Sequence, residues 1–204
     1  MKQKSIVAVI FVFLSIGIFW GLPFLQSMRV FSKYHGRQIY KKAYNFTLLN
    51  PNQEPVSLNS FKGKYVFLFF GYTSCGLICP ITMEEIHKLS KLTEIKEIKF
   101  LFISLDPLRD NPESLKAYIS RYGNNFIALF SFDIKIIQKI QTKYMAYSDY
   151  SFFYSKQKTD YEINHTGFIY LIDSKGFLRL VYTEENPKAE QMFQDLQMLI
   201  QNGE

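Results

Sequence analysis

A run of aromatic and branched residues, YVFLFF at residues 65–70, constrains the fold of this chain more than any other feature of its sequence. A segment this apolar fits a strand that is covered on both faces. A short loop and then Pro80 follow the run, and beyond the proline apolar residues recur at helical spacing, at Met83, Ile86, Leu89 and Leu92. A buried strand followed by an amphipathic helix predicts an α/β fold.

The remainder of the chain continues this alternation of strands and helices. We expect a hairpin within 44–61, a second buried strand at 98–106, a helix at 111–123, a short strand at 126–130, an amphipathic helix at 133–145, two strands within 165–182 joined by a turn at 174–176, and a helix at 186–201. This order implies a central sheet with helices on its faces, in one domain of residues 44–204.

The N-terminal segment has the properties of a membrane anchor. Residues 6–25 contain no charged residue, and a helix of that length spans roughly 30 Å, the thickness of a bilayer core. Two lysines precede the segment and no small-residue cleavage site follows it, so we interpret residues 1–25 as an uncleaved single-pass anchor rather than a signal peptide. Residues 26–43 are predicted to be a tether. Its basic residues argue against the orientation that we favour, with the domain translocated across the membrane.

The charge of the chain argues against a nucleic-acid partner. The formal net charge is +6 at pH 7, but the basic residues are spread along the sequence. The chain has no dense block of lysine and arginine and no nucleic-acid-binding motif. This pattern is typical of a solvated surface.

The only two cysteines, Cys75 and Cys79, lie in the loop between the buried strand and its helix. Ligands bind at the carboxyl ends of strands in open α/β sheets, so this loop is a candidate site. With Pro80 at the first helical position, both sulfurs lie near a helix N-terminus, which predicts lowered thiol pKa values. Their spacing permits a structural disulfide, a redox pair or two ligands for Cu(I) or Zn. Two cysteines are too few for an iron–sulfur cluster.

Among the three histidines, His165 is the one placed to act with the cysteines. It lies just before a strand that should be central, and a loop at that point can face the same sheet edge. His87 is predicted to lie on the surface, and His35 in the tether is assigned no role. Asp106 follows the second buried strand, where it either lies near the site or caps a turn. Arg109 and Asp110 are predicted to form a local ion pair.

Three segments together resemble the Sco/SenC proteins: FKGKYVFLFFGYTSCGLICP, FISLDPLRDNPESLKAYISRYG and EINHTGFIYLID. The resemblance runs from about residue 45 to the C-terminal helix. It implies a thioredoxin-like fold on a single anchor in the inner membrane, with the domain in the periplasm or an equivalent compartment. It also implies that Cys75, Cys79 and His165 bind copper, as Cu(I) or Cu(II). The implied partner is the cytochrome c oxidase subunit with the dinuclear copper site, which such proteins supply with copper or whose cysteines they reduce. Another copper carrier or a thiol reductase is a further implied partner.

The chain departs from the usual pattern of this family beside the proposed ligands. Gly76 and Leu77 stand where the family usually has proline and aspartate, and Asn164 replaces the aspartate that usually precedes the histidine. The alternative function is a thiol–disulfide oxidoreductase that uses Cys75 and Cys79 as its catalytic dithiol, or in a weaker variant a peroxidase. A metal or redox sensor would use the same residues. His165 discriminates a copper chaperone from an oxidoreductase, because dithiol exchange needs only the cysteines, whereas nothing in the sequence separates a sensor from a chaperone.

Overall fold

The computed structural model describes residues 33–76, 78–93, 97–149, 161–183 and 187–203. The predicted anchor, residues 1–25, therefore lies outside the described residues. Within the described part of the chain, no helix combines the length and the apolar character that a membrane span requires. Residues 34–204 form one compact unit.

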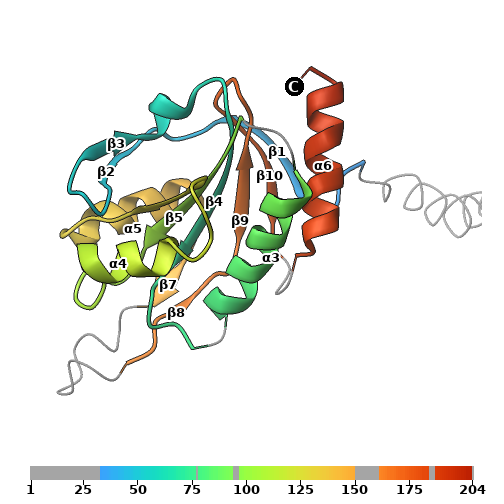
Figure 1. Ribbon diagram of the computed structural model, residues 1–204. Helices are drawn as coiled ribbons and strands as arrows, with labels where there is room; N and C mark the ends of the chain where they lie inside the picture. Colours follow the sequence, from blue (N-terminus) through green and yellow to red (C-terminus); the bar gives the residue numbers. More distant parts are fainter. Residues whose placement is uncertain (1–32, 77, 94–96, 150–160, 184–186, 204) are drawn as a thin grey trace, which may run out of the picture. The chain divides into compact units, whose positions relative to one another are not determined.

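A mixed sheet of six strands, in the order β1-β10-β9-β4-β5-β6, forms the centre of this unit (Figure 1). Its strands are β1 (Arg37–Lys42), β4 (Tyr65–Gly71), β5 (Ile98–Ser104), β6 (Phe126–Leu129), β9 (Ile169–Ile172) and β10 (Phe177–Tyr182). Strands β4, β5 and β6 run parallel to one another, and β9 runs antiparallel to β4. Two small sheets accompany the main one and pair β2 (Thr47–Leu49) with β3 (Pro55–Ser57), and β7 (Ser148–Asp149) with β8 (Asn164–His165).

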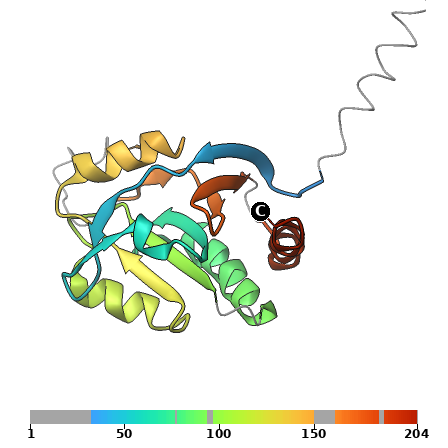
Figure 2. The ribbon, with the colours of Figure 1, turned by 90° about the horizontal axis from the view of Figure 1, so that it is seen from above.

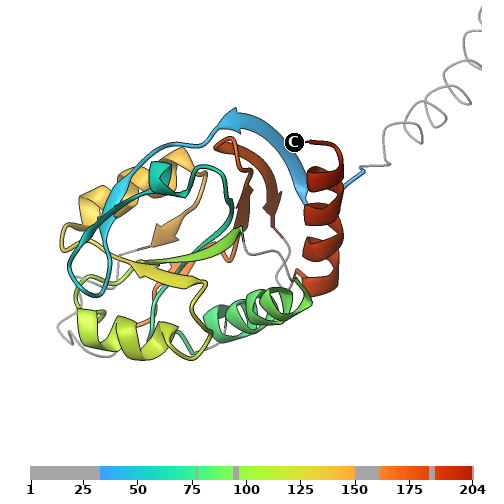
Figure 3. The ribbon, with the colours of Figure 1, turned by 45° about the horizontal axis from the view of Figure 1, so that its top comes forward.

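Helices cover both faces of the sheet. Figures 2 and 3 show α3 (Ile78–Leu92), α4 (Pro112–Ile119) and α6 (Ala189–Gln201) on one side and α5 (Ile134–Lys143) on the other. A short 3-10 helix, η2 (Leu58–Phe61), leads into β4. Alternate side chains of β4 point to opposite faces, so Phe69 packs beside Phe102 while Phe70 contacts Tyr144 and Tyr170. This two-sided burial explains why residues 65–70 are apolar without interruption.

The topology brings three distant segments to one edge of the sheet. Because β4 and β5 are parallel, with Gly71 opposite Ser104, the loops that follow them meet at the same edge. Strand β9 is antiparallel to β4, with Ile169 opposite Phe69, so the residues before β9 reach that edge as well. The loop of Cys75, the loop of Asp106 and the segment of His165 therefore converge.

The predicted α/β order is confirmed, including the hairpin of β2 and β3 and the turn between β9 and β10. The tether prediction is wrong for residues 37–42, which form β1 and pair antiparallel with β10. Helix α3 begins at Ile78, two residues before Pro80, so Cys79 lies inside its first turn rather than at its cap.

Candidate metal centre

Two thiols and one imidazole meet at the edge of the sheet. Cys75 lies in the loop after β4, Cys79 in the first turn of α3, and His165 in β8. One ligand atom from each residue lies within 4.8 Å of the other two. The closest described approach joins Cys79 Sγ and His165 Nε2, which are 3.5 Å apart. Both cysteines are free thiols.

The start of α3 acts on the two sulfurs differently. The backbone N–H of Cys79 donates to the Sγ of Cys75 at 3.3 Å, so the sulfur that receives a hydrogen bond from the helix terminus is that of Cys75. Cys79 is fully buried. The hydrogen bond with Cys75 and this burial raise the pKa of the Cys79 thiol well above its ordinary value, so the prediction of a lowered pKa is wrong for this residue.

The pKa of Cys79 is raised because the lowering effect of the helix terminus is smaller than the effects that oppose it. A helix terminus contributes about 0.3–1 kcal/mol, less than one unit of pKa, whereas full burial shifts a pKa by several units. A metal ion that binds Cys79 must therefore displace its proton.

The ring of His165 is oriented by its surroundings. Its Nδ1 lies 3.1 Å from the backbone oxygen of Thr166. A carbonyl oxygen only accepts, so Nδ1 carries the proton and Nε2, which faces Cys79, keeps its lone pair free for a metal. The rings of Phe69 and Tyr72 meet the imidazole edge-on, with centroids at 6.3 and 5.8 Å.

A buried ion pair supports the segment that leads to His165. Arg109 Nε lies 2.5 Å from Asp106 Oδ2, and Asp106 is fully buried. The hydroxyl of Tyr161 donates to the other carboxylate oxygen of Asp106, and Arg109 Cζ lies 3.6 Å from the centroid of the Tyr161 ring. Asp106 also accepts the backbone N–H groups of Leu108 and Arg109, as a turn cap does. Arg109 pairs with Asp106, so the predicted pair with Asp110 is wrong.

Asp110 instead holds the loop that carries Cys75. Its carboxylate accepts the backbone N–H of Thr73 at 3.1 Å and the hydroxyls of Thr73 and Ser104, each at 2.5 Å. Burial raises the pKa of Asp110, although these hydrogen bonds oppose the shift. The bonds fasten the loop after β4 to the end of β5.

The contact that joins the end of β4 to the residues before His165 was not predicted from the sequence. The hydroxyl of buried Tyr72 donates to the carboxylate of Glu162 and accepts the backbone N–H of Ile163 at 3.2 Å. Burial and the Glu162 contact raise the pKa of Tyr72. Tyr72 thus fixes the residues that precede His165 to the end of β4. No motif marks this pair, because its members are 90 residues apart.

The other two histidines lie outside the metal-ligand group. His87 packs its ring against Tyr122 and Phe126, with centroids at 5.7 and 6.1 Å, so it is partly buried and not on the surface as predicted. His35 donates its backbone N–H to Asp195 at 2.9 Å. It fastens the start of the domain to α6.

Comparisons with known proteins agree with this architecture. The model of the SCO1/SenC family matches residues 35–201. An SCO2-like protein of Rickettsia conorii is 30% identical over 208 residues, covering 95% of this chain and 98% of the relative. The structure of Bradyrhizobium japonicum ScoI with copper bound is 31% identical, with a TM-score of 0.66 over 78% of this chain and 99% of that one.

A second solved structure shows the same fold at lower identity. The protein is BsSco, a member of the Sco family of cytochrome c oxidase assembly proteins, in which a disulfide switch was identified. The two chains are 24% identical, and the TM-score is 0.61. The match covers 80% of this chain and 95% of that one. The predicted thioredoxin-like α/β fold is confirmed by these structures. Since the family model spans most of the chain and the full-length relative agrees, the chain belongs to the SCO1/SenC family.

Proposed function

We propose that this protein binds copper through Cys75, Cys79 and His165 and passes it to the dinuclear copper site of cytochrome c oxidase, or prepares the cysteines of that site. The observation that carries the proposal is the convergence of two thiols and one imidazole within 4.8 Å from three separate segments. Membership of the family and the copper in the Bradyrhizobium japonicum relative support copper as the cargo.

The ligand set suits a transferable copper ion. Thiolate sulfur and imidazole nitrogen are soft and borderline ligands, which favour Cu(I) over the hard cations. Cys79 is buried, whereas Cys75 is partly exposed and neighbours exposed Gly76. A thiolate of the partner can therefore approach from the side of Cys75, share the copper and take it over by ligand exchange. Each protein thiol loses a proton when copper binds and recovers one when copper leaves.

The test is a titration of the full chain in neutral detergent micelles with Cu(I), against a competing chelator and without oxygen. We expect one tightly bound copper in the unmodified protein and none in Cys75→Ser. His165→Ala should weaken binding by at least the roughly 10–100-fold that the loss of a supporting residue costs a metal site. His35→Ala is the matched control, because this histidine lies outside the ligand group, and it should bind as the unmodified protein does.

The same titration separates copper transfer from dithiol exchange. A reductase needs Cys75 and Cys79 but no third ligand. Copper binding that does not depend on His165 would contradict the three-ligand site and favour a thiol–disulfide oxidoreductase. The two activities are compatible in one cycle, because a Cys75–Cys79 disulfide must be reduced before its sulfurs can bind copper.

We also propose that residues 6–25 anchor the protein in the inner membrane, with the domain in the periplasm or an equivalent compartment. The support is the uncharged length of this segment, which matches a bilayer core. After extraction of membranes with alkaline carbonate, we expect the full chain in the pellet and a chain without residues 1–25 in the supernatant. Release of the full chain by carbonate would contradict an integral anchor.

A further inference from the structure

A cavity of about 670 Å³ lies at the end of the sheet opposite to the metal centre. It is lined by the end of β1 and the residues that follow it, by η2 and the loop between η2 and β4, by the turn between β9 and β10, and by the end of α5. Its volume lies within the range of about 300–1,000 Å³ that is usual for small-molecule sites. The metal chemistry described above uses none of these residues.

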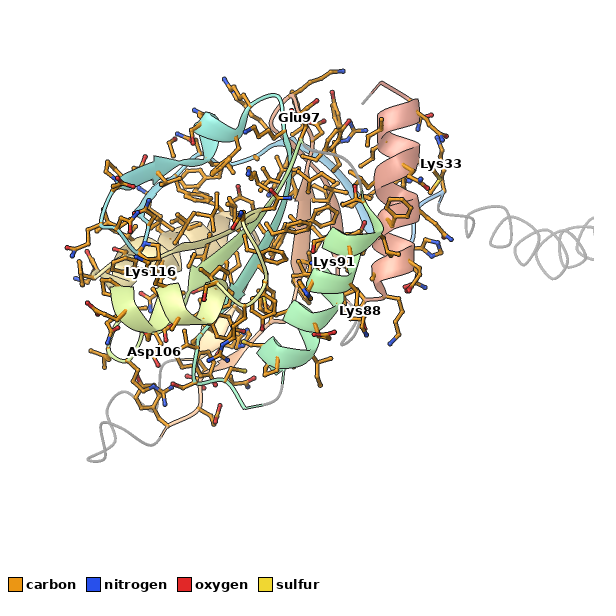
Figure 4. All side chains as sticks on the ribbon, viewed as in Figure 1. Lys33, Lys88, Lys91, Glu97, Asp106 and Lys116 are labelled. Atoms are coloured by element: carbon orange, nitrogen blue, oxygen red, sulfur yellow. The ribbon has the colours of Figure 1, made fainter. Side chains whose placement is uncertain are left out.

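The two sites are separated by the length of β4. The chain enters β4 beside the cavity, at Tyr65, and leaves it at Gly71 beside the metal centre. Seven residues of strand at about 3.3 Å each place the sites roughly 20 Å apart. The neighbouring strand shows the same polarity, because Glu97 and Asp106, just before and just after β5, appear at opposite ends of the sheet in Figure 4.

The lining of the cavity is strongly basic. Six of its residues are lysines: Lys41, Lys42, Lys62, Lys64, Lys143 and Lys175. The one acidic residue of the lining is Asp173, and its oxygens already have partners. Oδ1 accepts the backbone N–H groups of Lys175 and Phe177, and Oδ2 lies 3.1 Å from Arg179 Nη1. No carboxylate of the lining is left to neutralise a lysine.

Several of the lysine amines have no fixed partner. Lys41 Nζ donates to the backbone oxygen of Lys143, and Lys175 Nζ to that of Gly203, and neither acceptor is a carboxylate. Among the described residues, the side chains of Lys42, Lys62 and Lys64 make no ion pair and no hydrogen bond. Like charges that line one cavity without counter-charges repel one another, and a bound anion would relieve that repulsion.

The walls that carry these lysines are held in place without a ligand. The backbone N–H of Ala43 donates to Gly176 O at 2.9 Å and joins the end of β1 to the turn after β9. The N–H of Gly63 donates to Ser174 O at 2.8 Å and joins the loop of Lys62 and Lys64 to the same turn. The cavity is therefore pre-formed, as binding sites for small molecules usually are.

We propose that this cavity binds a small polyanion whose charge is carried by phosphate groups. The lysine ammonium is a point charge that binds phosphate readily, and the lining has no arginine to select a planar, bidentate partner. Two sources share this chemistry, a soluble polyphosphate compound and the headgroup of a phospholipid that carries more than one phosphate group. The site is independent of the metal centre, and its ligand would bind whether or not copper is present.

The test is calorimetric titration of the full chain, in neutral detergent micelles, with inorganic tripolyphosphate. We expect saturable 1:1 binding that weakens with added salt. The double variant Lys62→Gln/Lys64→Gln should bind at least tenfold more weakly, which corresponds to about 1.4 kcal/mol. The matched control is Lys91→Gln/Lys116→Gln, which removes the same charge from exposed positions on α3 and α4, away from the cavity (Figure 4), and should bind as before.

A second arm identifies the source of the phosphate. A short-chain cardiolipin, whose headgroup carries two phosphate groups, is added to the micelles, and displacement of tripolyphosphate identifies a lipid headgroup as a ligand of the site. Retention of tripolyphosphate identifies a soluble ligand. Equal weakening in the two double variants would show that only net charge matters and would overturn the proposal, as would absence of saturable binding. Unchanged thermal unfolding and Cu(I) binding of the cavity variant show that its fold and its metal centre are intact.

Discussion

Replacing Arg109 with methionine is expected to destabilise the domain by about 3 kcal/mol or more, because it leaves the carboxylate of Asp106 buried without its counter-charge. Asp106 has no exposed side-chain surface, whereas 17% of the Arg109 side chain is exposed. The remaining partners of Asp106 are the Tyr161 hydroxyl and two backbone N–H groups, which do not neutralise its charge. Chemical denaturation of the full chain in detergent measures the loss.

The variant should also bind Cu(I) more weakly, since Arg109 packs on Tyr161, four residues before His165. The control is the double variant Asp106→Asn/Arg109→Met, which removes both charges. Removal of both members of a buried ion pair destabilises a protein less than removal of one, because no unpaired charge is left buried. The double variant should therefore recover part of the stability. If Arg109→Met were no less stable than the double variant, the pair would not be coupled as the structure indicates.

The sequence was sufficient to predict the strands that are buried on both faces. Residues 65–70 are apolar throughout, and residues 98–104 are apolar except at Lys99 and Ser104, because helices cover both faces of the sheet, and the pattern could be read directly. The meeting of Cys75, Cys79 and His165 at one edge could also be predicted, because each lies next to such a strand, while their proposed role as ligands came from the family resemblance. Strand β1 was missed because it pairs along only one edge and alternates exposed with partly buried residues, so its RQIYKK sequence looks like a polar linker.

The supporting contacts of the metal centre could not be predicted, for a different reason. Tyr72 meets Glu162, and Asp106 meets Tyr161, across separations of 90 and 55 residues. No local pattern encodes such pairs, which exist only once β4, β5 and β9 are in register. The pKa of Cys79 is raised first by its hydrogen bond with Cys75 and then by burial, and depth of burial is a property of the folded sheet that a cysteine near a helix terminus does not reveal. Local sequence therefore predicted which residues meet at the sheet edge but not their environment.

Gly71→Ala is expected to damage the metal centre although Gly71 is not a ligand. A Cβ at this position would lie 2.8 Å from Cys79 Sγ, 2.8 Å from a ring carbon of Phe102 and 2.9 Å from one of Phe69. All three neighbours are buried, so none can move aside freely. Overpacking of this kind costs about 1–3 kcal/mol of stability. The sulfur of Cys79 must shift relative to His165, and we expect Cu(I) affinity to fall at least tenfold, or about 1.4 kcal/mol.

Two other glycines near the centre provide matched controls for this prediction. A Cβ on Gly76 would lie 3.9 Å from Glu162 Oε1, and one on Gly167 would lie 3.6 Å from Ile78 Cγ2, both ordinary contact distances. Gly76→Ala and Gly167→Ala should therefore leave stability and copper affinity close to those of the unmodified protein. If Gly71→Ala behaved as these controls do, the sulfur of Cys79 would not be confined against β4. If all three variants lost copper equally, the loops around the centre would tolerate no side chain, and the role assigned to Gly71 would not be specific. A loss confined to Gly71→Ala would show that the end of β4 sets the position of the buried sulfur, because the variant leaves every ligand in place.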